Sequence, residues 1–293
     1  MIFPEFFEKE LAAQYTPQEI EEIVRGYGAK RPVSFRVNPL RGEREQTLRS
    51  LEEEGIDFSC VAWYADAFVS GADERTIANT RVYRMGAIYL QSLSSMLPPL
   101  ALGAAAGESV LDMTAAPGGK TTQISALTQG GALITACEKD GGRFSRLRYN
   151  VEKQGSPRVT LLHCDATRLD DFFRFDKILL DAPCSGSGTL QAGESVKITE
   201  KTLLGCMQTQ SALLKKAWRL LKRGGELVYS TCSIFEKENA GALRQVLTEP
   251  DAEVIPLEMP ADIPVFPRTD GAVCVKPSVN YEGFFLAKIR KKG

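Results

Sequence analysis

The chain has 293 residues, of which 43% are hydrophobic and 25% charged, and its 36 basic and 37 acidic residues leave a net charge of −1. No apolar run approaches the roughly 20 residues needed to cross a bilayer, and the first five residues lack the basic segment of a signal peptide. We therefore expect a cytoplasmic protein with no membrane partner. A nearly neutral chain has no overall basic field, so any contact with nucleic acid must come from local patches.

The cysteine pattern excludes two common roles. Seven cysteines are present, no two have CxxC spacing, and His163 is the only histidine. This argues against a zinc site, any other metal site and a disulfide framework. It also excludes a Ser-His-Asp triad unless His163 belongs to it, and we expect His163 to be structural.

The first 84 residues predict a small α+β module. Residues 1 to about 30 read as two helices, the second opened by a capping box of Thr16 and Glu19. Residues 33–37 alternate like a half-buried strand, and residues 47–54 form an amphipathic pattern. Six basic residues crowd into this module: Lys30, Arg31, Arg36, Arg41, Arg44 and Arg49. They form either a solvated basic face or a surface that contacts phosphate groups.

From residue 85 to residue 293 we expect one catalytic domain. Residues 85–97 predict a connecting helix that ends before Pro98, and regular alternation follows. Strands are predicted at 109–113, 133–138, 159–163, 177–181 and 226–231, and helices at 119–127, 143–154 and 203–221. Residues 284–289 predict a closing edge strand. This alternation is typical of an α/β fold with a parallel sheet wrapped by helices.

The ends of the predicted strands favour a nucleoside-containing ligand. The first strand runs into a small-residue turn at 114–120 that opens a helix, where free backbone N–H groups are exposed. The following strands end near Glu138, Asp165 and Asp181, on the edge where open α/β sheets hold ligands. For a single acid, a helix cap or a loop role is the more common explanation, whereas the set of acids favours a nucleoside-containing cofactor. The phosphate-cradling spacing of a P-loop is missing, so S-adenosylmethionine fits better than NAD or ATP.

Two predicted strands also end in a cysteine. Residues 179–186 read Leu-Leu-Asp-Ala-Pro-Cys-Ser-Gly, and residues 227–233 read Leu-Val-Tyr-Ser-Thr-Cys-Ser. Pro183 has no N–H to continue a ladder, so Asp181 and Cys184 are left at the end of the strand. Two thiols on adjacent turns beside an acid are more indicative of catalysis than a lone cysteine, which is usually a core residue.

These motifs closely resemble those of the RNA (cytosine-5) methyltransferases of the RsmB/RsmF-like group. The resemblance rests on residues 112–123, 181–188 and 230–233, with weaker support from 35–38, 89–91 with 94–95, Glu238-Asn239 and 282–285. It implies a Rossmann-like S-adenosylmethionine-dependent methyltransferase with a mostly parallel seven-stranded sheet. The implied partner is RNA, either rRNA or tRNA, and no obligate protein partner is evident.

The resemblance also implies the roles of individual residues. Cys232 attacks C6 of a cytosine, Cys184 helps to remove the C5 proton and release the adduct, Asp181 absorbs charge on the ring, and Lys120 supports the ring or the acid. The cofactor is held by Thr114, Ala115, Ala116, Pro117, Gly118, Gly119, Lys120, Glu138, Arg143, Asp165 and Asp181.

Two alternatives stay open. A DNA cytosine-5 methyltransferase uses the Pro-Cys cysteine as nucleophile and needs a large recognition region that is not evident here. A non-catalytic RNA-binding or ribosome-assembly factor could keep the fold.

Three parts of the sequence depart from the family pattern: Ser92, Ala240 and the segment 191–201. We expect these departures to change contacts with RNA rather than the reaction.

Overall fold

A computed structural model describes residues 3–193, 195–268 and 270–293, so Met1 and Ile2 of the expected N-terminal module lie outside the described residues. The chain forms two compact units. The first unit contains residues 1–31 and 169–293, and the second unit contains residues 32–168. Each unit is described by itself below.

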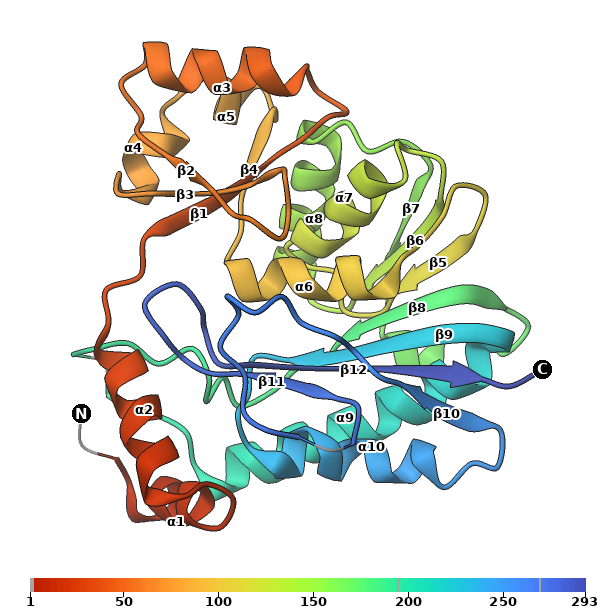
Figure 1. The fold of residues 1–293 in the computed structure, drawn as a ribbon. Helices are drawn as coiled ribbons and strands as arrows, with labels where there is room; N and C mark the ends of the chain where they lie inside the picture. The colour runs from red at the N-terminus through yellow and green to blue at the C-terminus, as the bar shows by residue number, and fades with distance from the viewer. Residues whose placement is uncertain (1–2, 194, 269) are drawn as a thin grey trace. The chain divides into compact units, whose positions relative to one another are not determined.

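The second unit begins with a four-stranded antiparallel sheet in the order β2-β3-β1-β4. Its strands are β1 (Val33–Val37), β2 (Ser59–Cys60), β3 (Ala67–Ser70) and β4 (Ile88–Leu90). Its helices are α3 (Arg44–Glu53), α4 (Glu74–Ala78) and α5 (Arg81–Arg84). In Figure 1, α3 and α5 lie above the strands and α4 lies at their left end. The rings of Phe35 and Phe68 stack in the core beside Leu51 and Ile77, all of them buried. The apolar face of β1 explains this packing.

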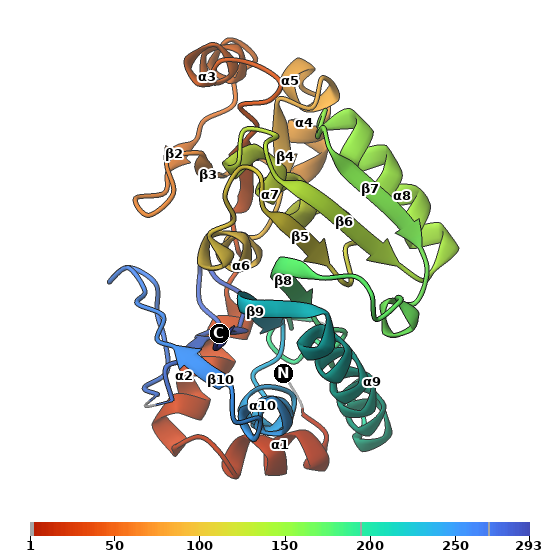
Figure 2. The same ribbon diagram turned by 90° about the vertical axis from the view of Figure 1, so that its right-hand side faces the viewer.

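The rest of the second unit is a parallel three-stranded block. It consists of β5 (Ser109–Asp112), β6 (Leu133–Glu138) and β7 (Val159–His163), with α6 (Leu93–Leu102), α7 (Gly119–Leu127), α8 (Gly141–Lys153) and the 3₁₀ turn η1 (Ala166–Arg168). Figure 2 shows the three strands side by side with their arrowheads at one edge. Phe144, Leu147 and Val151 of α8 pack on Ala136 of β6. The carboxyl ends of the strands therefore share one rim.

The segment around Pro98 differs from the prediction. In place of one helix over 85–97, strand β4 is followed by α6, which continues through Pro98 and Pro99 to Leu102. Pro99 cannot donate to the carbonyl of Ser95. The side chain of Gln91 supplies the missing donor, because its Nε2 donates to Ser95 O at 3.0 Å. This tertiary bond, which is not visible in local sequence, lets the helix continue.

The first unit is built on β8 (Phe175–Asp181), β9 (Leu221–Thr231), β10 (Ala252–Ile255), β11 (Val273–Val275) and β12 (Phe284–Lys291). Its helices are α1 (Glu5–Ala12), α2 (Pro17–Gly28), α9 (Glu200–Leu220) and α10 (Ala240–Leu247), with the 3₁₀ turn η2 (Glu236–Glu238). Strands β8 and β9 are parallel, whereas β12 is antiparallel to β9, β10 and β11. Among the described residues, the parallel block contains three strands and this unit contains five. Together they make eight strands, one more than the seven that the resemblance implies.

The prediction of an edge strand at 284–289 is wrong. Strand β12 lies between β9 and β10 and is hydrogen-bonded to both. Its first four residues, Phe284, Phe285, Leu286 and Ala287, are all buried. A continuous apolar run of this kind is typical of a strand covered on both faces.

Two further features of the described residues bear on function. None of the helices combines the length and the apolarity that a membrane span requires. No group of three or more His, Cys, Asp or Glu side chains there is placed to hold a metal ion.

The capping box of Thr16 and Glu19 is confirmed, with Thr16 N 2.8 Å from Glu19 Oε2.

Candidate active site

The paired strands β8 and β9 bring the two cysteine turns of the first unit together. Asp181, the last residue of β8, is paired in register with Ser230 of β9. The chain beyond each strand end turns toward the other, and the Sγ atoms of Cys184 and Cys232 lie 3.1 Å apart. Both cysteines are half-buried. The two thiols are therefore immediate neighbours.

Glycine makes the close approach of these turns possible. A Cβ added to Gly188 would lie 1.9 Å from the carbonyl oxygen of Gly283, which no side chain can tolerate. The N–H of Gly188 donates to Cys232 O at 3.0 Å, and the N–H of Gly283 donates to Gly188 O at 2.8 Å. The turn after Cys184 is thereby tied to the turn at Cys232 through the backbone.

Asp181 has a partner that sequence reasoning missed. The hydroxyl of Ser230 donates to Asp181 Oδ1 at 2.8 Å, and the N–H of Ala182 donates to Ser230 O at 2.8 Å. Because Ser230 and Asp181 are opposite in register, the bond follows from the pairing of β8 with β9. Ser230 is visible in the sequence as part of a motif. Its bond to Asp181 could not be predicted, because it depends on the register between two strands whose paired residues are 49 positions apart.

The chemical state of Cys184 follows from its neighbours. A hydrogen bond with the Cys232 thiol, burial and the nearby Glu238 carboxylate raise the pKa of Cys184 well above its ordinary value. A thiol with a raised pKa keeps its proton in the free protein. Once deprotonated, such a thiolate is a stronger base than an ordinary one.

In the second unit, the turn between β5 and α7 has the form of a ligand cradle. Gly118 has φ +108°, a left-handed conformation that favours glycine. Asp112, at the end of β5, accepts a hydrogen bond from Thr121 Oγ1 at 2.6 Å, which holds the start of α7 against the strand. Lys120 Nζ donates to Ser95 Oγ at 2.8 Å.

The acids on the same rim are held by local bonds. Glu138 accepts from the N–H of Asp140 at 2.9 Å, and Arg143 Nε lies 3.5 Å from Glu138 Oε2. Arg143 also donates to Ala116 O at 2.9 Å, so it links the acid to the cradle. Asp165 accepts from both the hydroxyl and the N–H of Thr167, and these bonds lower its pKa. The structure thus places Thr114 to Lys120, Glu138, Arg143 and Asp165 on one edge of one unit.

Most of the basic residues expected on an RNA-contacting face make bonds within the protein. Arg36 is fully buried and donates to Gln91 Oε1, Gly119 O and Thr122 Oγ1 at 2.7–3.1 Å. Arg41 donates to two carbonyls at the end of α8, and Arg44 donates to Ala65 O. The prediction that Arg36 lies on the surface is wrong, because its position in β1 points the side chain into the unit rather than to solvent.

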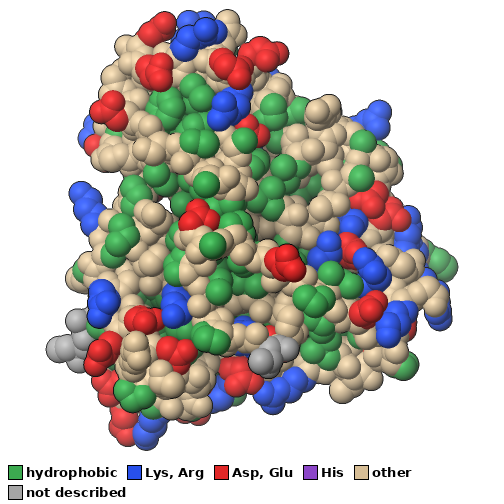
Figure 3. All heavy atoms as spheres, in the orientation of Figure 1, with side chains coloured by type: hydrophobic (Ala, Val, Ile, Leu, Met, Phe, Trp, Pro, Cys, Tyr) green, Lys and Arg blue, Asp and Glu red, His purple; other side chains and the backbone are tan. Residues whose placement is uncertain are grey.

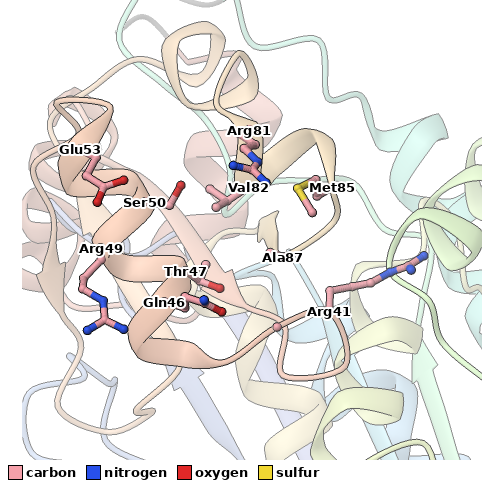
Figure 4. A pocket seen from close by; sticks show the side chains of 11 residues that line it. Arg41, Gln46, Thr47, Arg49, Ser50, Glu53, Arg81, Val82, Met85 and Ala87 are labelled. Atoms are coloured by element: carbon pink, nitrogen blue, oxygen red, sulfur yellow. The ribbon is translucent and has the colours of Figure 1, made fainter.

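An open pocket lies between α3 and the segment from α5 to β4 (Figure 4). It is lined by basic and neutral polar side chains, by the carboxylate of Glu53 and by the apolar side chains of Val82, Met85 and Ala87. Arg49 and Arg81 are exposed there, and no hydrogen bond or ion pair of their guanidinium groups is found among the described residues. Arg81 was not among the expected basic residues, because it lies outside the crowded stretch of sequence.

Comparison with known proteins gives two family matches. The model for the 16S rRNA methyltransferase RsmB/F family matches residues 99–290, and the model for the ferredoxin-like domain of RsmF/B-like methyltransferases matches residues 3–69. Among curated relatives, a ribosomal RNA small subunit methyltransferase F from Shewanella frigidimarina is 36% identical over 99% of this chain and 62% of its own length. The chain spans about three-fifths of the length of these relatives.

Solved structures show the same fold. A methyltransferase homolog protein from Pyrococcus horikoshii is 32% identical, with a TM-score of 0.81 over 99% of this chain and all of that one. NSun6 from the same organism, solved with SFG, has a TM-score of 0.89 over 99% of both chains at 22% identity, which speaks to fold alone. The Rossmann-like methyltransferase fold is therefore shown for this chain.

Proposed function

Because the chain belongs to the RsmB/F family of S-adenosylmethionine-dependent methyltransferases, we propose that it methylates C5 of a cytosine in RNA. The observation that carries this proposal is the 3.1 Å approach of Cys184 and Cys232 at the ends of two parallel strands. The names of the curated relatives favour small-subunit rRNA over tRNA as the substrate class.

In the proposed reaction, Cys232 is the nucleophile. Its thiolate forms a bond to C6 of the cytosine, which makes C5 electron-rich. Asp181, held by Ser230, faces charge that develops on the ring. Once C5 has received the methyl group, Cys184 in its thiolate form takes the proton from C5. The electrons of the C5–H bond form the C5–C6 double bond again, and the bond between C6 and Sγ of Cys232 breaks. The raised pKa of Cys184 favours this division of roles, because it disfavours Cys184 as the attacking thiolate.

The rim of the second unit that carries Glu138, Asp165 and residues 114–120 offers hydrogen-bond acceptors and donors suited to an adenosyl group. The carboxylates of Glu138 and Asp165 can accept from ribose hydroxyls and an adenine amino group, and the cradle at 114–120 presents backbone N–H groups. S-adenosylmethionine supplies an electrophilic methyl group when bound. Arg143 fixes Glu138, and Lys120 is held by Ser95.

The module formed by β1–β4 and α3–α5 is proposed to contact the RNA backbone. Arg49 and Arg81 offer guanidinium groups that form no ion pair with the described residues, at the pocket of Figure 4 beside the amide of Gln46 and the hydroxyl of Ser50. A single-stranded or extruded target is expected, because a cytosine must leave its stack to reach a thiol.

Trapping with an RNA that contains 5-fluorocytosine tests the proposed reaction. Fluorine at C5 cannot leave as a proton does, so the covalent protein–RNA adduct persists. We expect the adduct to form in Cys184→Ala and to disappear in Cys232→Ala, as seen on a denaturing gel. The opposite pattern would indicate the DNA-methyltransferase type of nucleophile. Cofactor binding with no transfer of a tritiated methyl group to RNA would indicate a non-catalytic RNA-binding protein.

A further inference from the structure

Two consecutive polar residues, Glu238 and Asn239, are buried beneath the cysteine turns of the first unit. Their side chains are 0% and 1% exposed. No lysine or arginine of the described residues forms an ion pair with Glu238. Burying a carboxylate without a cation is costly unless neutral donors replace water. The bonds that these two side chains make therefore indicate what they hold in place.

The carboxylate of Glu238 binds the turn that carries Cys184. Its Oε1 accepts from the N–H of Ser185 at 2.8 Å, and its Oε2 accepts from the Ser185 hydroxyl at 2.5 Å. Gln210 of α9 donates to Glu238 Oε1 at 3.2 Å and to Pro183 O at 2.9 Å. Both chain neighbours of Cys184 are thus bound by buried side chains, Ser185 by Glu238 and Pro183 by Gln210.

The amide of Asn239 binds the turn that carries Cys232. Its Oδ1 accepts from the Thr231 hydroxyl at 2.6 Å, and its Nδ2 donates to Ser233 O at 2.9 Å. Thr231 and Ser233 are the chain neighbours of Cys232. One dipeptide therefore fixes both cysteine turns, although the cysteines are 48 positions apart.

We propose that Glu238 and Asn239 are positioning residues that set the distance between the two thiols, each acting on one cysteine and so on one step of the reaction. This inference rests on the proposed function for the assignment of steps. Neither side chain is hydrogen-bonded to a sulfur atom in the described residues, so both act through the backbone of the turns. Asn239 governs attack by Cys232, and Glu238 governs release by Cys184.

Single substitutions separate the two effects. Asn239→Ala should slow formation of the 5-fluorocytosine adduct at least tenfold with little change in KM for RNA. Glu238→Ala should instead accumulate a covalent protein–RNA species on ordinary cytosine, because release is impaired. Glu238→Gln should restore release, since an amide can keep both bonds to Ser185. Ser185→Ala removes one of these bonds from the side of the turn and should reproduce part of the release defect.

The matched control is Gln245→Ala. This change removes a half-buried bond between α10 and α9, from Ser211 Oγ to Gln245 Oε1 at 2.7 Å, without touching either turn. It should leave both steps unchanged. Equal losses in both steps for Asn239→Ala, Glu238→Ala and the control would show a merely structural role and overturn the proposal.

A second measurement does not depend on methyl transfer. Diamide oxidises two adjacent thiols to a disulfide and takes up their two protons and two electrons. The wild-type protein and Gln245→Ala should form the Cys184–Cys232 disulfide quickly, and Glu238→Ala and Asn239→Ala at least tenfold more slowly, as read by mass spectrometry. Unchanged rates in the two variants would refute the positioning role. A rate difference without any RNA adduct in the wild type would refute the proposed function alone.

Discussion

At the scale of single residues, the two thiols control each other. The hydrogen bond between the two thiols is the largest cause that raises the pKa of Cys184, followed by burial. In Cys232→Ala this cause is lost, so the pKa of Cys184 should fall, although burial still keeps it raised. The pH at which iodoacetamide labels Cys184 at half its maximal rate should therefore move to lower pH, as measured by site-resolved mass spectrometry.

The exposed cysteine Cys60 provides the control for this measurement. Cys60→Ala should leave the labelling profile of Cys184 unchanged. A profile in Cys232→Ala that stays in place or moves to higher pH would show that the two thiols are not coupled in solution.

Which site residues could be predicted from sequence depends on whether their role is local. Cys184, Cys232 and Asp181 follow the ends of apolar runs, and the occurrence of two such cysteines beside an acid made them candidates. Glu238 and Asn239 were noted only through the family resemblance, because their partners lie up to 53 positions away. Arg36 was predicted on the surface, since charge in sequence says nothing about a buried polar network.

At the scale of elements, a buried carboxylate joins three strands of the first unit. Glu226 of β9 lies 2.5–2.9 Å from the cationic groups of Lys177 on β8 and of Lys288 and Arg290 on β12. Burial opposes ionisation, but the hydrogen bonds from these cations outweigh it and lower the pKa of Glu226 to about 2. We expect Glu226→Gln to lower the free energy of unfolding by roughly 2–3 kcal/mol at pH 7.

The difference in the free energy of unfolding between the wild type and Glu226→Gln should depend on pH. Because the pKa of Glu226 is lower in the folded than in the unfolded chain, its stabilisation is present above the unfolded value of about 4.3 and is lost as the pH falls toward 2. Urea denaturation at pH 7 and near pH 3 should show the gap between Glu226→Gln and the wild type narrowing. A gap that is constant with pH would show that packing, not charge, is lost.

Elements could be predicted where local pattern decides them. The predicted bounds of β6, β7 and α7 match the structure, because each is a clear apolar run closed by a polar or glycine-rich turn. The path of α6 through Pro98 and Pro99 could not be predicted, since the Gln91 side chain that satisfies Ser95 O lies outside the helix. The interior place of β12 depends on strand pairing across the unit.

At the scale of the whole molecule, charge is balanced rather than concentrated. Basic and acidic side chains are interspersed over the face shown in Figure 3, in keeping with the net charge of −1. RNA can therefore be bound only through local groups that keep their charge free of internal partners. Arg36, Arg41 and Arg44 donate to groups of the protein, whereas the guanidinium groups of Arg49 and Arg81 have no such bond among the described residues.

The salt dependence of RNA binding tests this assignment. Each phosphate contact to a single strand contributes roughly 0.7 to the slope of log K against log salt. Replacing both Arg49 and Arg81 by Ala should therefore weaken binding at low salt and reduce that slope by about 1.4, as measured by fluorescence anisotropy with labelled rRNA fragments. Arg75→Ala, an exposed change in α4 outside the pocket, is the matched control and should leave the slope unchanged. Equal slopes for the double variant and the wild type would mean that the RNA backbone does not bind at this pocket, while adduct formation at Cys232 would still be tested independently.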